Sequence, residues 1–291
     1  MNNKLIKATR VINDVDTTGA EVEMKDVNGT QAICINGEVY PNNHFTVASG
    51  PDYTGSTSMH NAHDGGICIT RLWTQVGGTG YFSVWNGYDD YNWEPLDEYI
   101  YEALSDHPDT YLIISLRLDV PDWYEKQNPD AFLIDSEGNG GHGVSFASEK
   151  FIEDAMKANY DMVEHMKQQP YWNRVIGALL AGCKTKEWLW HATETTTVGD
   201  FSVAGEASWK KWVKEEYKTD AALQEAWNDS SVTLETVHVP TFEERVGDAY
   251  ETILDPATQK NVIDYLRYKG ETVANTFINW AAKVTEQVDD K

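Results

Sequence analysis

Short apolar runs alternate with amphipathic stretches along most of the chain. Four apolar runs predict strands, at about residues 45–48, 67–73, 111–118 and 175–181. Between them, apolar residues recur every three or four positions and predict helices, at about residues 58–64, 94–106 and 148–168. Because strands that alternate with helices form parallel βαβ units, we expect a parallel sheet that is covered on both faces.

Hairpin signals mark the first part of the chain. Asn28–Gly29 and Asn36–Gly37 are dipeptides typical of tight β-turns, and they lie in a stretch of short strand-like pieces. We therefore expect a small β lead-in over residues 1–40. The remainder, residues 41–291, is expected to form one domain that contains an insertion at residues 193–256.

Two further helices are predicted after the fourth strand. The first lies around Ser208–Trp227, within the insertion. The second is a long amphipathic helix from about Thr258 to Gln287, with Val262 and Tyr265 among its apolar positions.

The charge of the chain restricts its partners. It has 23 basic and 47 acidic residues, which gives a net charge of −24 at pH 7. Nucleic acids and anionic membranes bind cationic surfaces, so we expect neither as a partner. No apolar run approaches the ~20 residues of a membrane span, and the N-terminus lacks the apolar core of a signal peptide. We therefore expect a cytoplasmic protein.

No motif for a metal or a cofactor is recognised, and we predict neither. His60 and His63 are three positions apart on a predicted helix, but no convincing third ligand accompanies them. The chain has 3 cysteines, widely spaced and without a CxxC motif.

The strongest candidate for chemistry follows the fourth apolar run. The run breaks at Gly182 and leads to Glu187, which is flanked by Trp188 and Trp190. In barrel enzymes the reacting groups lie at the carboxyl ends of the strands. A carboxylic acid can protonate a leaving glycosidic oxygen, and indole rings can pack on a sugar face. The alternative is that Glu187 is an ordinary surface carboxylate.

Further candidates lie after the second and third apolar runs. Arg71 stands within an apolar run, so it needs either a structural carboxylate partner or a substrate group. Asp119 ends the third run and either faces the expected cleft or caps a turn. Trp123 is a candidate sugar platform, as is Trp188, with hydrophobic packing as the alternative role. His142, in a glycine-rich loop, either contacts a sugar or is simply exposed.

The order of several short motifs resembles the barrel domain of clan A glycoside hydrolases, in particular the family 42 β-galactosidase type. The resemblance extends over about residues 35–285. The motifs that carry it are Thr70–Trp73, Trp93–Asp97, Asp119–Tyr124, Asn128–Asp130, Asp135–Gly138, His142–Ser148, Glu187–Trp188, Trp209–Tyr217 and Leu223–Asn228.

This resemblance implies an α/β fold of the (β/α)8 TIM-barrel type, with only about the first four βα units present. It implies a retaining glycoside hydrolase for β-galactosides or related β-glycosides, with Glu187 as the general acid/base. The family's nucleophile follows the seventh strand, which lies outside the resemblance, so we expect this chain alone to be inactive.

Lys186 departs from the family pattern, in which an asparagine that contacts the sugar precedes the acid/base. We keep Lys186 as a candidate substrate-binding residue. A lysine beside Glu187 favours the charged carboxylate, which is the wrong direction for a general acid. Adjacent residues on an extended backbone face opposite sides, so Lys186 can point away from Glu187.

Three interpretations remain open. The chain is the N-terminal half of a glycosidase that needs a C-terminal half-barrel, or a half-barrel that binds carbohydrate without cleaving it. The third interpretation is a half-barrel that pairs with another copy, because half of a barrel leaves two strand edges without partners. All three share a carbohydrate as the expected ligand.

Overall fold

The computed structural model of the protein describes residues 19–40, 43–47, 57–77, 83–140, 143–182, 187–188, 190, 199–246 and 253–288. The chain divides into two compact units. The first comprises Met1–Trp123, Met156–Gly182 and Ala281–Lys291, and the second comprises Tyr124–Ala155 and Cys183–Trp280.

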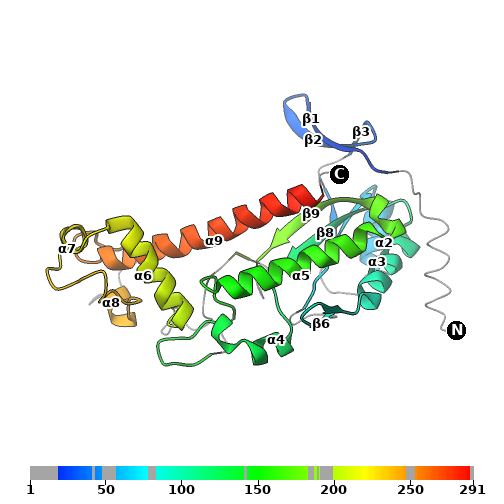
Figure 1. Ribbon diagram of the computed structural model, residues 1–291. Helices are drawn as coiled ribbons and strands as arrows, with labels where there is room; N and C mark the ends of the chain where they lie inside the picture. Colours follow the sequence, from blue (N-terminus) through cyan, green and yellow to red (C-terminus); the bar gives the residue numbers. More distant parts are fainter. Residues whose placement is uncertain are drawn as a thin grey trace. The chain divides into compact units, whose positions relative to one another are not determined.

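A four-stranded parallel sheet forms the centre of the first unit (Figure 1). Its strands are β4 (Phe45–Val47), β5 (Ile69–Leu72), β8 (Tyr111–Arg117) and β9 (Val175–Ala181). The order is β4-β5-β8-β9, and each neighbouring pair is parallel. The four predicted strands and their parallel arrangement are therefore confirmed. The described residues form no closed barrel, since no described strand pairs with the outer edge of β4 or β9.

Helices connect the strands, as the periodicity predicts. They are α2 (Thr57–Asp64), α3 (Glu94–Asp106) and α5 (Glu149–Lys167). In α3, Leu96, Ile100 and Leu104 are fully buried, which explains their four-residue spacing. Ser148 caps α5, because its Oγ accepts a hydrogen bond of 3.2 Å from the backbone N–H of Phe151.

The β lead-in closes one end of the parallel sheet. It consists of β1 (Val22–Val27), β2 (Thr30–Ile35) and β3 (Glu38–Tyr40), joined antiparallel. Ile35 packs in one buried cluster with Ile69, Tyr111 and Ile176, which lie at or next to the starts of β5, β8 and β9. The lead-in therefore covers the amino ends of the strands and leaves their carboxyl ends uncovered by this segment.

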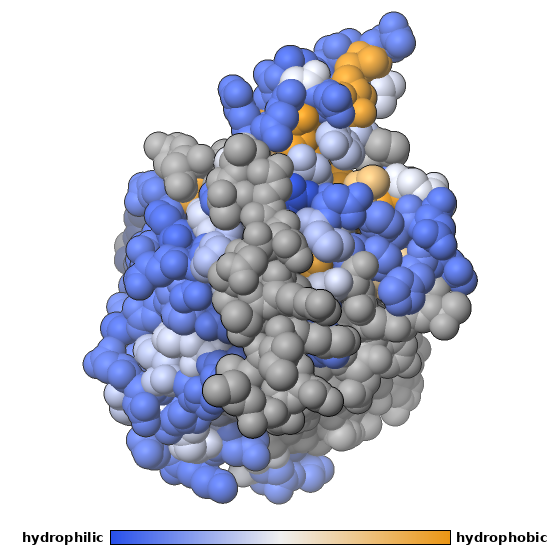
Figure 2. Space-filling model, turned by 90° about the vertical axis from the view of Figure 1, so that its right-hand side faces the viewer, coloured by the Kyte–Doolittle hydropathy of each residue, from blue (hydrophilic) through white to orange (hydrophobic). Residues whose placement is uncertain are grey.

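Apolar side chains also lie on the outer surface of the lead-in. Met24 is 59% exposed and Val39 is 54% exposed. Figure 2 shows this apolar surface at the top of the view, whereas most of the remaining coloured surface is hydrophilic.

The structure adds short elements that the apolar pattern missed. A hairpin of β6 (Trp85–Gly87) and β7 (Asp90–Tyr91) lies between β5 and α3. The segment between β8 and α5 contains α4 (Asp122–Gln127) and the 3-10 turn η2 (Pro129–Ala131), and a second such turn, η3 (Pro170–Arg174), precedes β9. Such short segments have too few residues to show a period.

The prediction of a single helix at Ser208–Trp227 is wrong. The structure has two helices there, α6 (Val203–Tyr217) and α7 (Asp220–Trp227). Lys218 adopts a left-handed backbone with φ of 66°, which ends α6, and Thr219 caps α7 by accepting a hydrogen bond from Ala222 N. A short α8 (Phe242–Val246) follows, and then α9 (Lys260–Gln287), close to the predicted bounds.

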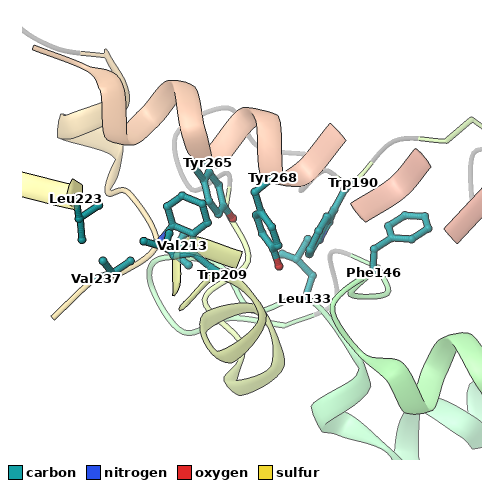
Figure 3. Close-up of a cluster of buried hydrophobic side chains, with 10 residues drawn as sticks. Leu133, Phe146, Trp190, Trp209, Val213, Leu223, Val237, Tyr265 and Tyr268 are labelled. Carbon is teal, nitrogen blue, oxygen red and sulfur yellow. The ribbon is translucent and has the colours of Figure 1, made fainter. Parts of the chain in front are cut away.

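Aromatic side chains fill the core of the second unit (Figure 3). Trp209 of α6 is fully buried and lies 5.3 Å from the ring of Tyr265 of α9. The carboxylate of Asp264 is also buried and accepts hydrogen bonds from the Tyr217 hydroxyl and from Trp227 Nε1. These contacts fix α6 and α7 against α9. None of the described helices combines the length and hydrophobicity of a membrane span.

Candidate functional site

Buried polar side chains gather at the carboxyl ends of β5 and β8. Arg117, the last residue of β8, donates from Nη2 to Asp119 Oδ2 and from Nη1 to Gln75 Oε1, each at 2.7 Å. The Arg117 and Asp119 side chains are only 4% and 11% exposed. Because the two charges are buried together and hydrogen-bonded, neither is left uncompensated.

An asparagine on α5 holds the end of β8 in place. Asn159 is fully buried and donates from Nδ2 to the Arg117 carbonyl oxygen at 2.8 Å, while its Oδ1 accepts from the Arg117 N–H at 3.2 Å. Thr74, just after β5, donates from Oγ1 to the Ser115 carbonyl oxygen at 2.8 Å. The two strand ends are therefore rigidly positioned by hydrogen bonds that sequence reasoning did not anticipate.

Arg71 on β5 has a different environment. Its guanidinium lies 4.3 Å from the centre of the Trp73 ring, a cation–π contact. No described carboxylate lies within ion-pair distance of it, and its Nε is buried without a hydrogen-bond partner among the described residues. Burial lowers the pKa of Arg71, but an arginine stays protonated in proteins. The group is therefore a cation that can bind a ligand oxygen.

Trp123 forms an aromatic wall with Trp85. The Trp123 Nε1 donates to the Trp85 carbonyl oxygen at 2.7 Å, and the two rings meet edge to face at 5.2 Å. Tyr88 makes a similar edge contact with Trp123 at 5.4 Å. Trp123 is partly exposed, so its indole is packed against Trp85 and also reaches the surface.

Glu187 belongs to the second unit. It lies six positions after the end of β9 and is exposed. Lys186 and His142 lie outside the described residues, so the expectation that Lys186 points away from Glu187 stays a prediction.

Trp188 takes part in hydrophobic packing, the alternative role considered for it. Its ring lies 5.2 Å from Phe277 and 5.9 Å from Trp280, both on α9. It also borders a hollow of about 460 Å³ together with Trp190 and Lys269. Burial, and secondarily the positive charge of Arg245, lowers the pKa of Lys269 to about 8.

The structure therefore groups the candidates only in part. Asp119 pairs with Arg117, and Arg71 stacks on Trp73, at ends of the same sheet. Arg117 was missed, although it stands in an apolar strand as Arg71 does and precedes an aspartate by two positions. The described residues contain no group of three or more His, Cys, Asp or Glu side chains that could hold a metal ion.

Comparison with known proteins shows similarity in fold only. The sequence matches no protein-family model and no curated protein. The structure resembles the β-galactosidase from Bacillus circulans sp. alkalophilus with a TM-score of 0.60 and 16% identity, over 84% of this chain and 34% of that one. For the β-galactosidase from Rahnella sp. R3, the TM-score is 0.60 and the identity 12%, over 93% and 36%.

The catalytic domain of a β-amylase from Paenibacillus polymyxa is similar as well. Its TM-score is 0.62 at 10% identity, over 84% of this chain and 62% of that domain. The chain thus spans about a third of the length of the two β-galactosidases. The parallel α/β sheet of this protein is therefore similar in fold to part of these glycosidase structures.

Proposed function

We propose that the protein is part of a retaining β-glycosidase of the family 42 β-galactosidase type, and that Glu187 is its general acid/base. The observation that carries this proposal is the set of groups at the carboxyl ends of β5 and β8. There the guanidinium of Arg71, which has no carboxylate partner among the described residues, the buried Arg117–Asp119 pair and the partly exposed Trp123 lie at the end where barrel enzymes bind substrate.

Each group has a chemical role in this proposal. The Arg71 guanidinium donates hydrogen bonds to sugar hydroxyls, and Trp123 packs on the apolar face of a sugar ring. Arg117 and Asp119 position the strand end rather than react, because each satisfies the other. Glu187 protonates the leaving oxygen and then removes a proton from water, while a second carboxylate, from outside this chain, attacks the anomeric carbon.

The test is hydrolysis of a series of aryl β-D-galactosides by the protein as the cell produces it. Glu187→Gln is expected to lower kcat/KM by about 10²–10⁴-fold for substrates with poor leaving groups and much less for dinitrophenyl galactoside, which needs no acid. Added azide restores turnover of the activated substrate, because an anionic nucleophile needs no general base.

Glu225→Gln is the matched control. Glu225 lies on α7, away from the strand ends in sequence, and its replacement leaves activity unchanged. If Glu187→Gln retains wild-type kcat/KM across the whole series, the acid/base assignment is wrong.

A second candidate function is assembly of half-barrels without catalysis. It is supported by the position of β9 at one end of the strand order β4-β5-β8-β9, because an edge strand can pair with another chain. Light scattering decides between a monomer and a dimer, and a dimer without turnover favours this candidate.

A further inference from the structure

A groove in the second unit lies between α6 and α9. It encloses about 980 Å³ and is lined by Ser208 and Trp212 of α6 and by Tyr268, Thr272, Asn275 and Asn279 of α9, with residues 127–131 and 146–150 along its rim. Small-molecule sites usually measure ~300–1,000 Å³, so this groove has room for an extended ligand. None of the strand-end residues lines it.

The polar groups of the groove are mostly neutral. Hydroxyl and amide side chains both donate and accept hydrogen bonds, as sugar hydroxyls do. The charged side chains on its walls are Asp130, Glu149, Lys150, Lys211 and Glu215, three acids against two bases. The net charge of −24 disfavours anions, and the nearly balanced charges of the groove form no acidic cluster that would select a strongly cationic ligand.

One wall of the groove is aromatic and fixed. Trp212 stacks on Trp209 with ring centres 5.4 Å apart, and its Nε1 donates to Glu271 Oε2 at 2.8 Å. The indole is therefore held in one orientation, and Trp212 is only partly buried. A flat ring held beside hydrogen-bonding groups suits a ligand with apolar C–H faces and polar edges.

Tyr268 supplies a further observation that points to a ligand. It is 2% exposed, and its hydroxyl has no hydrogen-bond partner among the described residues. The Ser208 and Thr272 hydroxyls partly offset the rise in its pKa that burial causes, but neither makes a hydrogen bond of good geometry to it. Figure 3 shows the Tyr268 hydroxyl pointing away from α9. A buried hydroxyl left without a partner costs stability.

We infer that the α6–α9 groove is a binding site for a neutral oligosaccharide, separate from the groups at the strand ends. Its hydroxyl and amide side chains bind the sugar hydroxyls, the edge of Trp212 that lines the groove contacts the C–H groups of a sugar ring, and the Tyr268 hydroxyl gains a partner when the ligand binds. The inference concerns binding only and does not depend on Glu187 being an acid/base.

The test is calorimetric titration of the whole chain with neutral tetrasaccharides, namely β-1,4-galactotetraose, cellotetraose and mannotetraose. At least one is expected to bind. The double variant Asn275→Ala/Asn279→Ala, on exposed helical positions, weakens that binding about tenfold or more, which is about 1.4 kcal/mol. Arg71→Ala, at the strand ends, leaves the groove affinity unchanged.

Tyr268→Phe provides a second readout. It removes only the unpartnered hydroxyl, so the melting temperature of the free protein rises while the tetrasaccharide binds more weakly. Tyr217→Phe is the matched control, because its hydroxyl donates to the buried Asp264. That change lowers the melting temperature and leaves binding unaltered.

Two results overturn the inference. If the double variant binds as tightly as the wild type while Arg71→Ala abolishes binding, the sugar binds at the strand ends. The assignment of the binding site to the groove is then wrong, whereas the proposed function is unaffected. If no tetrasaccharide binds, the groove is not a carbohydrate site. Loss of hydrolysis in Glu187→Gln with unchanged binding leaves the inference intact.

Discussion

The Arg117 guanidinium donates a hydrogen bond of 2.7 Å to the Asp119 carboxylate, two residues further along the chain. Both side chains are nearly inaccessible to solvent. Asp119 is therefore the counter-ion of a buried arginine, and it also accepts a hydrogen bond from the Val120 N–H at 3.0 Å. This pairing gives Asp119 a positioning role at the strand end, and Arg71 remains there as a cation without a carboxylate partner among the described residues.

We expect Asp119→Ala to lower the free energy of unfolding by about 3–5 kcal/mol, because it removes a carboxylate that compensates the buried charge of Arg117. Urea denaturation measures the loss. The control is Glu235→Ala, which removes the exposed Lys214–Glu235 pair and leaves the unfolding free energy nearly unchanged. Equal effects of the two changes would contradict the buried pairing.

The backbone of α6 passes close to Asp200 at Gly205. A Cβ added at Gly205 would lie 2.4 Å from the Asp200 carbonyl oxygen and 2.5 Å from its Cγ. Gly205→Ala is therefore expected to destabilise the protein by about 1–3 kcal/mol or more. Thermal unfolding measures this change.

Gly270→Ala is the matched control for that substitution. Gly270 lies within α9, and an added Cβ there meets nothing within 4 Å. The change should therefore stabilise the protein by about 0.5–1 kcal/mol through the higher helix propensity of alanine. If Gly205→Ala also stabilises, the close approach to Asp200 is wrong.

Lys269 should make stability depend on pH. Its pKa is lowered from 10.5 to about 8 in the folded protein, chiefly by burial. Between these values the unfolded chain binds more protons, so the free energy of unfolding rises as the pH is raised from about 8 towards 10. Lys269→Met is expected to abolish this rise and to add about 1–2 kcal/mol at pH 7, allowing for partial exposure.

Urea denaturation at pH 7, 8, 9 and 9.5 measures this dependence, with Lys283→Met, on the exposed side of the same helix, as the control. Higher pH is avoided because the tyrosines of the unfolded chain titrate near pH 10. Burial raises the pKa of Tyr160 in the folded protein to about 12, so this difference would lower the unfolding free energy and mask the effect of Lys269. If the unfolding free energy of Lys269→Met rises with pH as steeply as that of the wild type, Lys269 is not responsible for the pH dependence.

Local pattern predicted the regular elements well. The bounds of α3 and β9 agree with the prediction residue for residue, because the four-residue spacing of apolar residues in α3 and the continuous apolar run of β9 are visible in the sequence. The break between α6 and α7 left no such trace. It depends on a left-handed backbone at Lys218, and lysine is not among the residues that usually mark such a turn.

The sequence by itself determined the alternation of strands and helices, the β lead-in and the position of Glu187 after the fourth strand. These features depend on periodicity and on turn residues, which involve only residues close together in the chain. Only the tertiary structure decided which polar groups meet. Arg117 and Gln75 are 42 positions apart, so their contact arises from the pairing of β5 with β8 and not from any local pattern. The groove lined by α6 and α9 could not be predicted either, because its walls come from segments that are distant in sequence.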